Sequence, residues 1–438
     1  MNTTSQHIGI KQILADRGLD GSGREIWTKR LNEITSAEVE WALSRKPGYY
    51  VLDRLLILIS PAAENYLEKM AQLAHELTLQ RFGRTIRLYA PLYLSNLCVN
   101  SCLYCGFNKT HKFPRIRLTI EQALAEAEII AKEGFKDLLL VSGEDKTFIT
   151  VDYLADLAAK LRSKFSSLSV EIYQMTTDQY AQLFAAGIEG VTLYQETYDR
   201  DLYCKFHPAG PKADYDYRLS AADSFAQAGM REIGIGALLG LADPLRPRSE
   251  ASWRLETLAL AEHAQYLMKR YWKSRVSFSF PRLRPAKDVD LNPTAENAKS
   301  LAESRLSEAE DAEKKNNKKL ISAVSACSAV SSFGGFQLLS DKNLVQMILA
   351  LRLCFADAGL TISTREPVYL RDHLVTLGIT RMSAGSKTNP GGYSHADSVG
   401  QFDVNDSRSP AQIAAMLKSQ NLEPVWKDWD PGFLLPSE

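Results

Sequence analysis

Short apolar segments alternate with amphipathic segments along most of the chain after residue 85, and this alternation is the strongest constraint on its fold. Helical periodicity fills most of the intervals between the apolar segments, for example at 119–133, 151–164, 250–270 and 341–358. Strands that are joined through helices pair in parallel, and eight such units predict a closed α/β barrel of the (β/α)8, TIM type. The eight predicted strands are Ile86–Leu94, Asp137–Ser142, Leu168–Tyr173, Gly190–Tyr194, Arg231–Leu238, Arg275–Phe280, Leu360–Ser363 and Ile379–Ala384.

Three regions lie outside this alternating pattern. Residues 1–85 are predicted to form an N-terminal helical region, in which Thr35 and Glu38 have the spacing of a capping box. The barrel is predicted to occupy residues 86–430 and to be followed by a C-terminal tail at 431–438. Lys287–Ser332 has no aromatic residue and no glycine, so it has little apolar surface to offset the entropy cost of ordering. It is predicted to be a low-complexity insertion between the sixth and seventh strands, partly helical at most and without a catalytic role.

Composition sets limits on partners and location. The 438 residues contain 52 Lys and Arg against 52 Asp and Glu, so no overall charge favours binding to nucleic acid. No apolar run reaches the roughly 18 residues of a membrane span, and the first residues lack the pattern of a secretory signal. Six irregularly spaced cysteines in a chain of this length do not form a disulfide framework. We therefore expect a reducing compartment, cytoplasmic with an organelle left open, and neither nucleic acid nor membrane as a partner.

Three of the six cysteines fall within the stretch LSNLCVNSCLYCGFN, where Cys98, Cys102 and Cys105 have the spacing C-x3-C-x2-C. This stretch follows the first predicted strand, so it lies at the carboxyl end of the barrel, where barrel enzymes have their active sites. Three thiolates on one short loop suit a [4Fe–4S] cluster and leave one iron free to bind a small ligand. Two alternatives stay open at this point: a zinc site completed by a distant Cys or His, and a fully ligated cluster in a non-catalytic iron–sulfur electron carrier.

With Tyr104 before the last cysteine, the motif resembles the signature of the radical S-adenosylmethionine (SAM) enzymes. The resemblance implies that SAM chelates the open iron, and that the reduced cluster cleaves SAM to methionine and a 5′-deoxyadenosyl radical. It also implies that six residues bind SAM, namely Tyr104, Gly143, Glu144, Gln195, Glu196 and Arg218. An ordinary turn between a strand and a helix is the alternative for the Gly-Glu pair, and surface charge is the alternative for the later positions.

Further segments resemble the 2-iminoacetate synthase (ThiH) family, the tyrosine lyases of thiamine thiazole biosynthesis. They are YQETY at 194–198, FPRLRP at 280–285, STRE at 363–366, RMSAGSKT at 381–388 and PVWKDWD at 424–430. The resemblance implies a carbon–carbon lyase that takes a hydrogen from the amino nitrogen of L-tyrosine. The Cα–Cβ bond then breaks, which yields 2-iminoacetate (dehydroglycine) and p-cresol. As partners the resemblance implies a thiazole synthase of the ThiG type and a flavodoxin or ferredoxin as reductant.

This reaction requires an anchor for the carboxylate of tyrosine. Arg365, at the end of the seventh predicted strand, is the candidate, because its planar guanidinium matches a carboxylate. The resemblance implies polar contacts to the same substrate group from Tyr93 and Ser383. The alternatives are a core aromatic residue at position 93 and a small loop residue at position 383. For Arg282 and Arg284, both substrate contact and loop salt bridges stay open.

Two related enzymes are alternatives with the same cofactors: a tryptophan lyase, and a tyrosine lyase of hydrogenase maturation that carries a further cysteine motif. The last cysteine here is Cys354, which favours the thiazole branch over the hydrogenase branch. Pocket shape decides between tyrosine and tryptophan, and only the likeness along the whole chain favours tyrosine. A scaffold for a thiazole synthase, inactivated by the insertion, is another alternative. Cys204, Cys327 and Cys354 are predicted to have no catalytic role.

Overall fold

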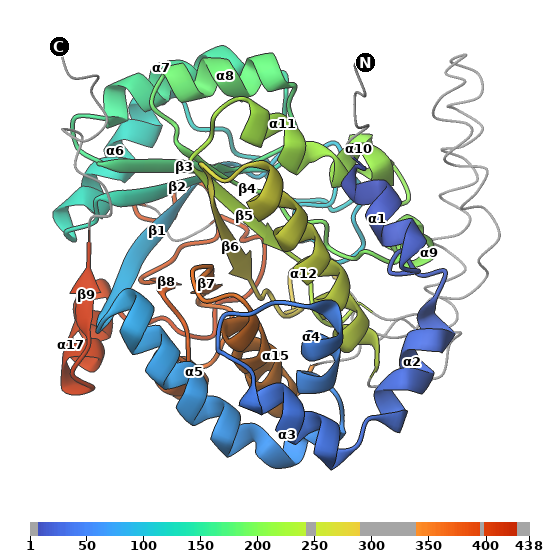
Figure 1. The fold of residues 1–438 in the computed structure, drawn as a ribbon. Coiled ribbons are helices and arrows are strands. Elements are labelled where there is room, and N and C mark those ends of the chain that lie inside the picture. The colour runs from blue at the N-terminus through green and yellow to red at the C-terminus, as the bar shows by residue number, and fades with distance from the viewer. Residues whose placement is uncertain (1–7, 242–250, 290–338, 395–397, 427–438) are drawn as a thin grey trace, which may run out of the picture.

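The computed structural model describes residues 8–241, 251–289, 339–394 and 398–426. Within these ranges, eight parallel strands close a barrel that is surrounded by helices (Figure 1). Strands β2 to β8 follow each other in sequence order, and β1 closes the ring by pairing with both β8 and β2. The barrel strands are β1 Thr85–Ser95, β2 Asp137–Ser142, β3 Ser167–Glu171, β4 Gly190–Thr192, β5 Glu232–Gly236, β6 Arg275–Ser279, β7 Gly359–Ile362 and β8 Arg381–Ser383.

The predicted barrel is confirmed, because each of the eight predicted strands matches an observed strand to within two residues at either end. Sequence analysis did not predict a further short strand, β9 (Glu423–Val425), which pairs in parallel with Thr85–Arg87 of β1. Its three residues include Pro424, so they show neither the length nor the alternation by which a strand is recognised in a sequence.

The helices lie on the outside of the barrel, and those predicted at 119–133, 151–164, 250–270 and 341–358 are confirmed as α6, α7, α12 and α15. None of the helices in the described ranges is both long and apolar enough to cross a membrane. The α-helices are α1 Ile10–Asp16, α2 Arg24–Glu33, α3 Ser36–Ser44, α4 Leu52–Leu58, α5 Leu67–Phe82, α6 Ile120–Lys132, α7 Val151–Leu161, α8 Thr177–Ala185, α9 Arg200–Phe206, α10 Tyr215–Leu219, α11 Ala221–Gln227, α12 Ala251–Arg270, α15 Asp341–Cys354, α16 Val368–Leu374 and α17 Pro410–Ser419, with 3-10 turns η1 Ala62–Tyr66 and η2 Pro211–Ala213.

The helices before β1 pack against the outer helices of the barrel, α12 and α15 (Figure 1). The predicted capping box is present, since the Thr35 hydroxyl accepts from the Glu38 N–H and the Glu38 carboxylate accepts from the Thr35 N–H at 2.8 Å. The division of the chain at residues 85 and 430 stays a prediction. Of the predicted insertion, only residues 287–289 lie within the described ranges.

Alternation along β1 separates the main core of the protein from the barrel interior. Leu88, Ala90 and Leu92 belong to the large apolar core, whereas Tyr89 and Tyr93 form a second cluster with side chains of β2 and of the cysteine loop. Successive side chains of a strand point to opposite faces of the sheet, so one face of β1 packs on helices and the other faces the centre of the barrel. The barrel interior therefore receives the polar side chains that form the site.

Charged side chains close the amino end of the barrel. Arg87 Nε lies 2.5 Å from Asp137 Oδ2, and Arg87 Nη1 lies 2.5 Å from Glu232 Oε1. Arg275 also pairs with Glu232, and Arg381 Nη2 lies 3.0 Å from Asp137 Oδ1. Burial acts to raise the pKa of Glu232, but the three arginines outweigh it and hold this pKa well below its usual range. We call these five residues the basal ion network.

Candidate active site

The cysteine loop follows β1 and is held in place mainly through its backbone. The N–H of Val99 donates to the Glu144 carbonyl at 3.1 Å, and the N–H of Leu103 donates to the Phe206 carbonyl at 3.1 Å. Arg115, which sequence analysis missed, donates to four carbonyl oxygens around the loop, those of Asn96, Phe107, Asn108 and His111. One half-buried guanidinium thus fixes the shape of the loop that carries the thiols.

The three cysteines line one cavity of about 120 Å³ at the carboxyl end of the barrel. We call it the thiol cavity. It also contains most of the residues that the sequence predicted to bind SAM, namely Tyr104, Gly143, Glu144, Glu196 and Arg218. Gln195 is the exception: its side chain is buried away from the cavity lining, and both amide atoms lack a hydrogen-bond partner in the described part of the chain.

The thiols are surrounded by groups that suit metal-bound sulfur. Asn100 Nδ2 lies 3.6 Å from Cys98 Sγ, and Gln401 Nε2 lies 3.9 Å from Cys105 Sγ. Burial raises the pKa of Cys102, and it raises the pKa of Cys105 to about 11, so these two thiols favour the protonated form unless a cation binds them. Within the described ranges, no three His, Cys, Asp or Glu side chains are arranged to hold a single metal ion.

Gly143 lets the turn after β2 lie directly against the cysteine loop. A Cβ atom at this position would lie 2.3 Å from the Leu97 carbonyl oxygen and 3.1 Å from Cys98 Cβ. Contacts under 3.0 Å require the backbone to shift, so only glycine permits this approach. The next residue, Glu144, accepts from Asn100 Nδ2 at 2.8 Å and pairs with Lys146 at 3.0 Å. The Gly-Glu pair therefore shapes the wall of the thiol cavity beside Cys98.

A chain of polar groups runs along another wall of the thiol cavity. The Lys212 ammonium donates to Glu196 Oε1 at 2.6 Å and to the Tyr104 hydroxyl at 3.1 Å. Tyr104 in turn lies 2.7 Å from His207 Nε2, and His207 Nδ1 lies 2.8 Å from the Tyr203 carbonyl. Burial lowers the pKa of His207, so the ring is neutral, with Nδ1–H donating to the carbonyl and Nε2 accepting from Tyr104.

Arg218 lies within α10 rather than at its start, because the helix begins at Tyr215. Its Nε donates to the Tyr194 carbonyl at 2.8 Å, which holds the guanidinium at the edge of the thiol cavity. No hydrogen bond joins its two Nη groups to any residue of the described ranges. A guanidinium that is fixed through Nε and free at both Nη groups is suited to bind a carboxylate.

A second cavity, of about 50 Å³, extends into the centre of the barrel, and we call it the barrel cavity. All three predicted substrate residues line it. The Tyr93 hydroxyl donates to Gln401 Oε1 at 2.9 Å, and the Ser383 hydroxyl accepts from the Thr364 N–H at 3.1 Å. The Arg365 guanidinium lies 3.3 Å from the centre of the Phe402 ring. The cation–π contact leaves the guanidinium edge of Arg365 free for a ligand.

The thiol cavity and the barrel cavity are contiguous, because they share six lining residues: Val141, Glu171, Tyr194, Pro281, Arg365 and Phe402. A ligand in the barrel cavity would thus lie next to a ligand in the thiol cavity.

Two arginines whose roles were left open do not line either cavity. Arg282 and Arg284 both pair with Glu366, and Arg284 Nη2 lies 2.7 Å from Glu366 Oε2. Both arginines therefore form loop salt bridges.

Sequence analysis missed Glu171, the last residue of β3, which lines both cavities. Burial raises the pKa of Glu171 to about 7, against the lowering effect of Arg365. The signal available in the sequence was its position, because polar residues at the carboxyl ends of barrel strands face the catalytic mouth. Gln401 and Phe402 were missed as well, since their distance from β8 along the chain hides their contact with the site.

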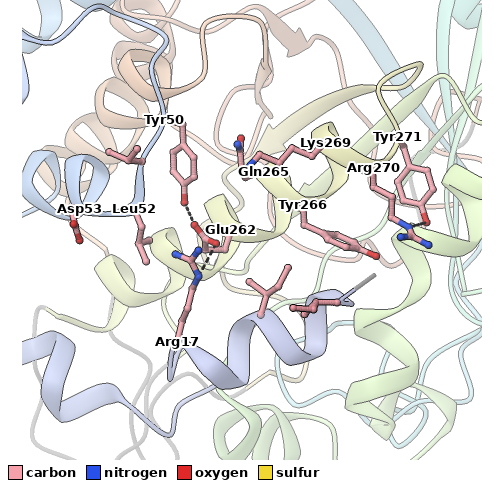
Figure 2. A pocket seen from close by; sticks show the side chains of 13 residues that line it. Arg17, Tyr50, Leu52, Asp53, Glu262, Gln265, Tyr266, Lys269, Arg270 and Tyr271 are labelled. Atoms are coloured by element: carbon pink, nitrogen blue, oxygen red, sulfur yellow. Dashed lines mark hydrogen bonds and ion pairs between the residues drawn. The ribbon is translucent and has the colours of Figure 1, made fainter. Parts of the chain in front are cut away.

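A wider hollow lies away from both cavities. It has a volume of about 910 Å³ and is formed on the outside of the barrel by α1, the residues before α4, and α12 (Figure 2). Its central carboxylate, Glu262, accepts from the Tyr50 hydroxyl and pairs with Arg17 Nε at 3.2 Å (Figure 2). This groove contains none of the residues that were predicted to bind a cofactor or substrate.

Two family models match the chain. The Radical SAM superfamily model covers residues 92–245, and the Biotin and Thiamin Synthesis associated domain model covers residues 279–423. The first range contains the three cysteines, and the second contains Arg365 and Ser383. The two matched regions therefore contain the three thiols and two of the three residues predicted to bind substrate, respectively.

Known proteins resemble the chain over most of its length. It is 39% identical to the 2-iminoacetate synthase of Salmonella typhimurium over 403 residues, which are 92% of this chain and 93% of the relative. The identity to the 2-iminoacetate synthase of Escherichia coli is 38% over 402 residues, with the same shares covered. The FeFe-hydrogenase maturase HydG from Carboxydothermus hydrogenoformans matches 95% of this chain and 83% of its own, with a TM-score of 0.73 and 28% identity.

Proposed function

We propose that this chain, which belongs to the radical SAM 2-iminoacetate synthase family, cleaves the Cα–Cβ bond of L-tyrosine. The products would be 2-iminoacetate and p-cresol, with methionine and 5′-deoxyadenosine formed from SAM. The observation that carries this proposal is the shared wall of two cavities, one lined by three thiols and the other by Arg365, Tyr93 and Ser383.

The residues of the thiol cavity fit an iron–sulfur cluster and SAM. Cys98, Cys102 and Cys105 would ligate three irons, and the amide donors of Asn100 and Gln401 lie beside two of the sulfurs. Five residues would contact SAM: Tyr104, Gly143, Glu144, Glu196 and Arg218. Gln195 is no longer proposed, because it does not line the cavity. When bound, the cluster and SAM supply the 5′-deoxyadenosyl radical that begins the reaction.

The residues of the barrel cavity would bind and orient the amino acid. Arg365 is placed to hold the substrate carboxylate, with its guanidinium plane fixed against Phe402. Tyr93 and Ser383 would add polar contacts from two neighbouring strands of the barrel, β1 and β8. Leu139, Val141 and Phe280 give the cavity apolar walls suited to an aromatic ring. Orientation of this kind brings the amino group toward the thiol cavity.

Two partners are proposed, one because the product is unstable and one because SAM cleavage needs an electron. 2-Iminoacetate hydrolyses in water, so a thiazole synthase that accepts it directly is proposed as the product's acceptor. Flavodoxin or ferredoxin is proposed as the electron donor. The match of residues 279–423 to the Biotin and Thiamin Synthesis associated domain supports the link to thiamine synthesis.

Product analysis tests the proposed reaction. The anaerobically reconstituted protein is mixed with SAM, a reductant and L-tyrosine, and 5′-deoxyadenosine, p-cresol and glyoxylate (from hydrolysis of 2-iminoacetate) are quantified. We expect all three in equal amounts, and no p-cresol when L-tryptophan replaces L-tyrosine. Formation of 5′-deoxyadenosine without p-cresol would assign the protein to another substrate, and the absence of both products would favour a carrier or a scaffold.

A further inference from the structure

We propose that Glu171 binds the α-ammonium group of the amino-acid substrate and accepts one of its protons, a role that rests on the proposed function. The evidence is geometric in the first place. Glu171 ends β3 at the carboxyl end of the barrel and lines both the thiol cavity and the barrel cavity. It therefore stands at the junction where a substrate in one cavity meets a ligand in the other.

The carboxylate of Glu171 makes no hydrogen bond to any residue of the described ranges, which sets it apart from the other acidic residues of these walls. Glu144 accepts from Asn100 and pairs with Lys146, and Glu196 accepts from Lys212. A half-buried carboxylate that loses part of its hydration without gaining a partner is costly, so it indicates a ligand that donates hydrogen bonds or carries positive charge.

The charges around Glu171 define that ligand more closely. Arg365, Lys212 and Arg218 act on it as positive neighbours and Glu196 as a negative one, and the tyrosines 89, 93 and 194 face it from β1 and the end of β4. Arg365 and Glu171 thus present a positive and a negative group on one shared wall. An amino acid in its zwitterionic form carries the complementary pair, with its carboxylate toward Arg365 and its ammonium toward Glu171.

The proton balance of the second part of the proposal is simple. One N–H bond of R–NH3⁺ breaks and its proton forms an O–H bond with the Glu171 carboxylate, so that R–NH2 and a neutral carboxylic acid result. No oxidant or reductant is consumed. Burial raises the pKa of Glu171 to about 7, which makes this carboxylate a better proton acceptor than an exposed glutamate.

Binding measurements on the complete enzyme test the proposal without turnover. Anaerobic protein with its cluster and SAM, but without reductant, is titrated calorimetrically with L-tyrosine and with 3-(4-hydroxyphenyl)propanoate, which lacks the amino group. Glu171→Gln is compared with Glu189→Gln. Glu189 is a matched control, because burial also raises its pKa to about 7 but it precedes β4 at the amino end of the barrel, outside both cavities.

The wild-type protein is expected to prefer L-tyrosine over the amine-free analogue by at least about tenfold. This preference should fall to roughly twofold or less in Glu171→Gln and persist in Glu189→Gln. The wild-type affinity for L-tyrosine should rise about tenfold between pH 6 and pH 8, as a carboxyl group with a pKa near 7 ionises. The affinity for the analogue should not rise, and Glu171→Gln should show no increase for either ligand.

An undiminished preference for the amino acid in Glu171→Gln would overturn the proposal. If this variant does not fold, Glu171→Ala, which also lacks the carboxylate, replaces it, and the same undiminished preference and unchanged pH dependence would count against the role. The result is independent of which amino acid is the substrate. If L-tryptophan binds in place of L-tyrosine and loses affinity in Glu171→Gln, the proposed function fails while the role of Glu171 is supported.

Discussion

Carboxylates at the two ends of the barrel differ in their partners and in the direction of their pKa shifts. At the amino end, Glu232 is paired with Arg87, Arg275 and, more distantly, Arg381 within the basal ion network, and these arginines hold its pKa below the usual range despite burial. At the carboxyl end, Glu171 has no hydrogen-bond partner in the described part of the chain, and burial raises its pKa to about 7. Glu171 ends β3 and Glu232 begins β5 of the same barrel, and both side chains are half-buried, so burial alone does not explain the difference.

The difference separates a region whose charged groups have partners within the protein from a region whose polar groups are open to ligands. The amino end satisfies its charges internally, which is the pattern of a region that serves stability. The carboxyl end holds three free thiols, an unpaired carboxylate and a guanidinium edge, which the proposed cluster, SAM and substrate would satisfy. Glu189 is an exception at the amino end. Burial raises its pKa to about 7, and one of its carboxylate oxygens has no hydrogen-bond partner in the described part of the chain.

The largest expected effect is at the carboxyl end, where Cys98→Ser should abolish formation of 5′-deoxyadenosine, by about a thousandfold or more, because cluster ligation fails. The free energy of unfolding of the metal-free protein should change by less than about 1 kcal/mol. Iron content, product formation and thermal unfolding measure the three quantities. Cys204→Ser, which does not line the thiol cavity, is the control and should keep its iron. Full iron content in Cys98→Ser would contradict the assignment.

At the amino end the opposite result is expected. Glu232→Gln should lower the free energy of unfolding by roughly 3–5 kcal/mol, because it leaves the buried arginines of the basal ion network without their shared carboxylate. Turnover per folded molecule should not change. Denaturant unfolding gives the stability, and Glu128→Gln, which breaks an exposed pair with Lys164, should leave it nearly unchanged. A catalytic defect in folded Glu232→Gln would show that the two ends are not separate in function.

Arg365→Ala should weaken binding of L-tyrosine by roughly 10- to 100-fold, since the substrate carboxylate loses its charged partner. The cluster spectrum and the rate of SAM cleavage without substrate should stay the same. Arg365→Lys keeps the charge but not the planar fork, so its affinity should lie between those of wild type and alanine variant. An unchanged KM for tyrosine in Arg365→Ala would remove this residue from substrate binding.

The smallest effect is on stability as a function of pH, and its sign differs between the two ends. The pKa of Glu171 is raised in the folded protein. Its stabilising contribution to the free energy of unfolding is therefore fully present below the pKa that Glu171 has in the unfolded chain, and it is lost as pH rises toward about 7. Glu171→Gln should therefore be more stable than wild type at pH 8, by about 1–2 kcal/mol, with the difference shrinking toward pH 5. For Glu232 the contribution is lost as pH falls. Thermal unfolding of ligand-free protein measures both, and a pH-independent difference for Glu171→Gln would contradict the account.

The sequence predicted the barrel well because each strand is an apolar run between helical segments, a pattern that local periodicity reveals. Most of the residues predicted for the site line the two contiguous cavities, since the cysteine loop and Arg365 follow strands whose carboxyl ends converge. Gln195 does not line the thiol cavity although Tyr194 and Glu196 do, and strand alternation could not have shown this, because β4 ends at Thr192. Glu171 and Gln401 were not predicted, because their importance comes from neighbours that are distant in the sequence.

The account depends on a cluster with three protein ligands and one iron left for SAM. The most direct test is electron–nuclear double resonance of the reduced cluster with SAM carrying ¹⁵N in its amino group. We predict a nitrogen coupling that appears with labelled SAM and shows that its amino group binds the cluster. A spectrum that SAM leaves unchanged, with a fourth protein ligand on the iron, would contradict the account.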